Sequence, residues 1–111
     1  MSNNLRDSDG NLFPMFVGAE GTVSVVTAGS ASSQTAAFGL STTLVRVATA
    51  LNNTASHCHY LLGTNPTATT TTCSMLPAGQ VVYMAVAPGQ KLAFIRGAST
   101  DLPVTVTEIA D

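Results

Sequence analysis

Short β-rich segments punctuated by turn-forming residues constrain the fold of this chain most strongly. From residue 22 onward, Val, Thr and Ile gather in runs that are separated by Pro, Gly and Asn. No run repeats its apolar residues at helical spacing, and the turns recur at roughly 8–12 residues. The pattern predicts an all-β domain of about eight short strands, built as a sandwich, a jelly roll or a barrel. The expected strands are residues 22–27, 34–40, 43–50, 57–62, 67–73, 80–87, 90–96 and 104–109.

The turn at residues 63–66 predicts a hairpin. If it centres between Asn65 and Pro66, Cys58 lies opposite Cys73. The threonine-rich run at 67–73 is assigned to the second strand, because β-branched side chains favour extended backbone. In this register Cys58, Tyr60 and Leu62 share the buried face, and His57 and His59 share the polar face with Thr70 and Thr72.

His57, Cys58, His59 and Cys73 form the one cluster that suggests a metal. Alternation along the strand separates the two histidines from Cys58, and no CxxC or HxxxH spacing occurs, so we expect no metal site. A cross-strand disulfide between Cys58 and Cys73 stays open as an alternative. A reducing cytosol favours free thiols.

The chain carries very little charge. Of 111 residues, 9% are charged, four are Lys or Arg, and the net charge is −2. The scattered cations argue against nucleic-acid binding, and no apolar run reaches the about 20 residues of a membrane span. The first residues lack the pattern of a secretory signal, so we expect synthesis in the cytoplasm.

Catalytic patterns are also missing from the sequence. It has no GxSxG elbow, no phosphate loop and no promising pair of carboxylates, and Glu108 is expected to point outward as a solvated or interface charge. We therefore expect neither an enzyme nor a bound cofactor.

Residues 1–21 differ from the domain expected at 22–111. They read as an N-terminal arm, polar at first and then apolar around Pro14. An apolar group near a chain end needs a surface to cover it, which is either the domain's own core or a neighbouring subunit. The expected partner contacts are Leu12, Phe13, Met15 and Phe16.

Several segments, taken in order, carry a family resemblance over about residues 34–109. They are Ala37-Phe38-Gly39, Val45-Arg46-Val47, Cys58-His59, Gly63-Thr64-Asn65-Pro66-Thr67-Ala68-Thr69, Leu76-Pro77-Ala78-Gly79, Pro88-Gly89-Gln90-Lys91-Leu92-Ala93 and Val106-Thr107-Glu108. The chain resembles the capsid decoration proteins, also called staple or cement proteins, of short-tailed epsilon-fifteen-like bacteriophages.

The resemblance implies a single-domain, jelly-roll-like antiparallel β-sandwich on the outer surface of a virion. Such a protein bridges neighbouring major capsid subunits, commonly as a homodimer, and has no catalytic residues. A phage tail or head-fibre domain is one alternative. A carbohydrate-binding β-sandwich module is a weaker one, because the chain has no Trp and its two tyrosines, Tyr60 and Tyr83, have apolar neighbours.

Overall fold

Eight strands make up the described part of the chain. The computed structural model describes residues 19–51 and 56–110, and these contain no helix. The strands are β1 (Ala19–Ala28), β2 (Ser33–Gln34), β3 (Thr42–Thr49), β4 (His57–Gly63), β5 (Ser74–Pro77), β6 (Val81–Ala85), β7 (Lys91–Arg96) and β8 (Leu102–Ala110).

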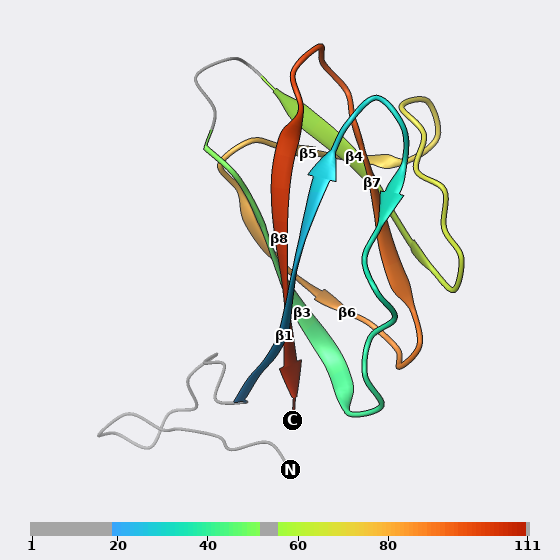
Figure 1. Cartoon of the computed structure of the whole chain (residues 1–111), viewed down its shortest axis with the longest axis vertical. Helices are drawn as coiled ribbons and strands as arrows, with labels where there is room; N and C mark the ends of the chain where they lie inside the picture. The colour runs from blue at the N-terminus through green and yellow to red at the C-terminus, as the bar shows by residue number, and fades with distance from the viewer. Residues whose placement is uncertain (1–18, 52–55, 111) are drawn as a thin grey trace, which may run out of the picture.

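The strands form two four-stranded antiparallel sheets (Figure 1). One sheet has the order β1-β8-β3-β6 and the other β2-β7-β4-β5. Each sheet therefore joins strands that are far apart in the sequence, as the nested Greek keys of an eight-stranded jelly roll require. The prediction of a jelly-roll-like antiparallel sandwich is confirmed.

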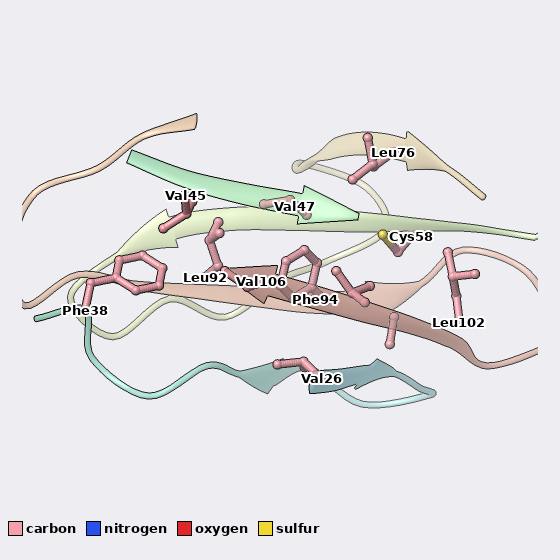
Figure 2. Packing of buried hydrophobic residues seen from close by; sticks show 12 residues of the cluster. Val26, Phe38, Val45, Val47, Cys58, Leu76, Leu92, Phe94, Leu102 and Val106 are labelled. Carbon is pink, nitrogen blue, oxygen red and sulfur yellow. The ribbon is translucent and has the colours of Figure 1, made fainter. Parts of the chain in front are cut away.

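A single apolar core lies between the two sheets (Figure 2). Its largest fully buried side chains include Phe94 and Leu92 from β7 and Leu102 from β8. The prediction that Cys58, Tyr60 and Leu62 share the inner face of β4 is confirmed, since Cys58 is fully buried and the other two pack against the core. The remaining buried members of the cluster are Val26, Ala28, Phe38, Val45, Val47, Leu76, Val104 and Val106.

The predicted partner strand of β4 was wrong. Residues 67–73 lie in a loop with a turn, and the strand that pairs with β4 is β5. Cys58 lies opposite Leu76, three residues beyond the predicted partner, and Tyr60 lies opposite Ser74. Both cysteines are free, so the disulfide alternative is not realised.

Tertiary contacts explain why the threonine-rich run forms a loop. The side-chain amide of Gln34 donates to Asn65 Oδ1 (3.1 Å) and to the Pro66 carbonyl (2.6 Å). The backbone N–H of Ala68 donates to Ser32 Oγ (2.9 Å), and Ala68 is buried. These anchors hold the loop beside β2 and outweigh the strand preference of threonine, which depends on context.

The weak strand predicted at 34–40 is mostly irregular. Only Ser33–Gln34 forms β2, yet the following residues stay beside β7. The N–H of Thr35 donates to the Leu92 carbonyl (2.8 Å), and the N–H of Phe38 donates to the Gln90 carbonyl (2.9 Å). Buried Phe38 thereby closes one end of the core.

Glu108 does not point outward as predicted. It lies on β8 opposite core residue Val45, and it is only 8% exposed. Its Oε1 accepts hydrogen bonds from the N–H of Gly39 (2.8 Å) and from Thr42 Oγ1 (2.7 Å). A buried carboxylate requires such donors, and here they fix the connection from β2 to β3.

Candidate interaction surface

The outer side of the β1-β8-β3-β6 sheet is a weakly charged surface among the described residues. We call it the low-charge face. Strand alternation and pairing place on it three residues of β1, four of β8, three of β3 and three of β6. They are Val23, Val25 and Thr27; Pro103, Thr105, Thr107 and Ile109; Leu44, Arg46 and Ala48; and Val81, Tyr83 and Ala85.

The pairing lines these side chains up in rows across the sheet. One row joins Val25, Thr105, Ala48 and Val81, one residue from each strand in sheet order. The neighbouring row ends on Tyr83 and contains Arg46, the one charged residue among the thirteen positions named above. Side chains that are directly opposite on neighbouring strands lie within contact distance, so the rows form a continuous surface.

Several apolar side chains of the low-charge face are open to solvent. Val25 is 69% exposed, Val23 53%, Val81 48% and Tyr83 43%. Val23 and Val25 lie on one edge strand of the sheet and Val81 and Tyr83 on the other, with β8 and β3 between them. A partner that covered one of these side chains completely would gain about 1 to 2 kcal/mol from burying the remaining apolar area.

The outer side of the other sheet is different, because a loop crosses it. We call it the loop-covered face. Ala93 points outward between Gln34 and Leu61, yet it is fully buried. The loop at residues 64–73, which is tied to Ser32 and Gln34, supplies buried Pro66 and Ala68 on this side. This loop accounts for the burial of Ala93.

Two histidines lie farther along the loop-covered face. His57 and His59 are half-buried, and their ring centroids are 5.4 Å apart at an interplanar angle of 70°. His59 Nδ1 lies 2.9 Å from the Cys73 carbonyl. The prediction that the histidines and Cys58 occupy opposite faces of β4 is confirmed.

The two thiols lie in opposite environments. Burial in the core raises the pKa of Cys58 to about 11. The backbone N–H of Thr69, which donates to Cys73 Sγ at 3.4 Å, lowers the pKa of Cys73. Cys58 therefore behaves as an apolar core residue, and Cys73 is the more readily ionised thiol.

The predicted contact residues Leu12, Phe13, Met15 and Phe16 lie outside the described residues. In the sequence they shortly precede Ala19, where β1 begins. Sequence reasoning missed the low-charge face. In β1 and β6, inward-facing and outward-facing positions alike are apolar, and this pattern in the sequence indicates an exposed apolar surface. The strand order is still needed to show that β1 and β6 belong to the same sheet.

Within residues 19–51 and 56–110, no three His, Cys, Asp or Glu side chains are placed to hold a metal together. The same residues contain no helix that could cross a membrane.

Comparison with protein-family models, with curated proteins and with solved structures finds no match in any of the three.

Proposed function

We propose that this protein is a virion structural protein that binds the outer surface of a phage head. It bridges neighbouring major capsid subunits and thereby stabilises the shell. The observation that carries the proposal is the low-charge face, which spans all four strands of one sheet and in which Arg46 is the one charged residue among the thirteen positions named above. The family resemblance over about residues 34–109 supports it.

Low charge favours docking for a physical reason. Burying an ionised group against another protein requires a partner charge or hydrogen bonds, whereas Val, Ala and Thr lose little solvation. The apolar side chains that protrude, Val23, Val25 and Val81, would supply the favourable burial. Each copy then needs only a modest affinity, because many copies on one particle act together.

The apolar segment before β1 supplies a second contact in this proposal. Aromatic residues in pockets often dominate the energy of an interface, at about 2 kcal/mol or more each. Phe13 and Phe16 are the candidates here, flanked by Leu12 and Met15. A domain face and a separate arm would allow one copy to contact two capsid subunits, and homodimer formation would double the number of contacts.

Introducing negative charge on the low-charge face tests the proposal. Val23→Asp with Val25→Asp places two carboxylates in the proposed interface, and we expect binding to undecorated heads to fall by about a hundredfold or more. Leu61→Asp is the matched control, because Leu61 is 41% exposed on the opposite sheet. Co-sedimentation with the heads measures both. Equal binding by the double variant and the control would contradict the proposal.

The arm is tested by Phe13→Ala with Phe16→Ala. We expect a folded protein that no longer decorates heads and no longer protects them against heat. If heads decorated with this variant keep normal occupancy and normal heat resistance, the arm does not contribute to binding. The proposal for the low-charge face would not be affected by that result. Images that locate the protein at the tail would favour the fibre alternative, and binding to a glycan array would favour the carbohydrate-binding one.

A further inference from the structure

We propose that two copies of this chain join through the free edge of β1, in an antiparallel pairing about a two-fold axis at Val25. The β1-β8-β3-β6 sheets of the two copies would then form one continuous sheet, and the low-charge face would extend across both copies. The inference names the interface of the homodimer that the proposed function includes, and it rests on that part of the proposal alone. Binding to heads is not required for it.

Three residues of β1 direct their backbone groups away from the sheet. β1 is an edge strand, and its one neighbour in the sheet is β8. Along an antiparallel strand, successive residues point their N–H and C=O groups to alternate sides. The N–H of Ala50 donates to the Pro103 carbonyl (3.0 Å), so odd-numbered residues of β8 bond β3 and even-numbered ones bond β1. The residues of β1 that lie opposite odd-numbered positions therefore face the free edge, and they are Val23, Val25 and Thr27.

This free edge lacks the usual protection against a further strand. In the described part of the chain, no hydrogen bond outside the pairing with β8 involves the backbone of Val23, Val25 or Thr27. Proteins commonly protect such edges with a charge, a proline or a bulge. Residues 22–28 contain no charged residue and no proline, and the irregular register of β1 lies before Val23. The edge is therefore a regular template for strand addition.

The other three sheet edges suit a second copy less well. β2 has two residues, and β5 has four and ends on Pro77, which has no N–H to donate. β6 has five residues, compared with ten in β1. The edge of β1 is therefore the longest that the described part of the chain presents.

The free edge of β1 is complementary to itself, which favours a second copy as the added strand. With Val25 opposite the partner's Val25, Val23 lies opposite the partner's Thr27, so residues with outward backbone groups meet throughout. Each directly opposed pair exchanges two hydrogen bonds. Val beside Val and Val beside Thr are compatible neighbours, and no like charges meet. The apolar segment before β1 is a poorer added strand, because Pro14 lacks a backbone donor.

Val25→Pro tests the pairing without heads. The N–H of Val25 is not used within the sheet, so the edge can accept proline, but each copy loses its central donor. We expect a weak dimer in the native chain, because one strand pair is a small interface, and a dissociation constant about tenfold or more higher in Val25→Pro. Val25→Thr is the matched control, since it keeps the N–H and the β-branched side chain. Sedimentation equilibrium measures all three, and circular dichroism checks their folding.

Cysteine cross-linking tests the register and does not depend on how proline is tolerated. The background is Cys73→Ser, in which the remaining thiol, Cys58, is buried. Opposed residues that exchange hydrogen bonds have Cα atoms about 5.5 Å apart, which a disulfide can span. Val25→Cys should therefore form a covalent dimer under mild oxidation. Val23→Cys alone should not, because the two thiols would be about 13 Å apart, whereas Val23→Cys mixed with Thr27→Cys should.

Three results would overturn the proposal. The first is a native chain that stays monomeric at every concentration. The second is a folded Val25→Pro variant that dimerises as well as the native chain, which would point to another edge such as β6. The third is a cross-linking pattern in which Val25→Cys reacts no better than Val23→Cys. Because none of these measurements contains heads, a failure of head binding alone would contradict the capsid proposal and not the pairing of β1.

Discussion

The two outer faces of this jelly roll contrast sharply although their inner faces contribute to one core. The low-charge face presents rows of Val, Thr and Ala across four strands. The loop-covered face hides Ala93, carries two histidines and a methionine, and is crossed by a loop that is anchored on β2. Strand alternation lets each sheet build its core with one side and a separate surface with the other.

The two faces should differ most in how much stability they lose when an aspartate is introduced. Ala93→Asp would bury an unpaired charge beneath the loop, and it should lower the free energy of unfolding by about 3 to 5 kcal/mol. Ala48→Asp, the same change on the low-charge face, should cost less than about 1 kcal/mol because Ala48 is only half-buried. Urea denaturation measures both values. Equal costs would mean that the loop does not seal Ala93 from water.

Alkaline pH should destabilise the protein through Cys58, which lies on the inner side of β4. The pKa of Cys58 is raised in the folded chain from 9.0 to about 11, so the unfolded chain releases this proton first. The contribution of this thiol to the free energy of unfolding is therefore fully present below pH 9. It is lost as the pH rises toward 11, by at most about 3 kcal/mol. Denaturation at a series of pH values should show this fall in the native chain. In Cys58→Ala, the free energy of unfolding should fall less steeply between pH 9 and 11. An unchanged slope would show that Cys58 does not cause the fall.

A methyl group at Gly97 tests how tightly the loop-covered face is packed. Gly97→Ala forces the His57 ring to move, and we expect a loss of about 1 to 2 kcal/mol. Gly21→Ala is the control in β1, because its Cβ would meet the Glu108 backbone at an ordinary 3.5 Å. Thermal denaturation of the two variants should give a clearly lower midpoint for Gly97→Ala alone. Similar midpoints would show that His57 swings away freely.

The smallest effect is expected on the low-charge face itself. Val25→Asp in the isolated protein should change the free energy of unfolding by no more than about 0.5 kcal/mol, since Val25 is 69% exposed. The same variant should be impaired in head binding if the proposed function is correct. A large loss of stability would mean that the exposed valines support the fold, and the binding defect would then need another explanation.

Turn chemistry made most of the fold predictable from the sequence. Pro88-Gly89 and Ala78-Gly79 mark real turns, and both glycines have positive φ, which glycine adopts without strain. The loop at residues 64–73 was not predictable, because its anchors Ser32 and Gln34 lie more than thirty residues away. The same distance effect hid the role of Glu108, whose partners on Gly39 and Thr42 are known only once the strand order is known.

The candidate sites were harder to predict than the fold. The low-charge face depends on strand order, which brings β1 beside β8 and β3 beside β6. The outer side of the other sheet depends on register, because His59 lies opposite Met75 only in the observed pairing. In the predicted pairing the hairpin was misplaced by three residues, and Met75 had no place opposite β4.

The position of β8 has a consequence for how the chain acquires its structure. β8 is the last strand in the sequence, yet it lies between β1 and β3 and holds both through antiparallel pairing. Contacts between residues so distant along the chain form slowly, because a long loop must close first. During synthesis, β1 therefore cannot pair with β8 until residues 102–110 have emerged from the ribosome. The synthesis of residues 102–110 therefore sets the moment at which this sheet can close.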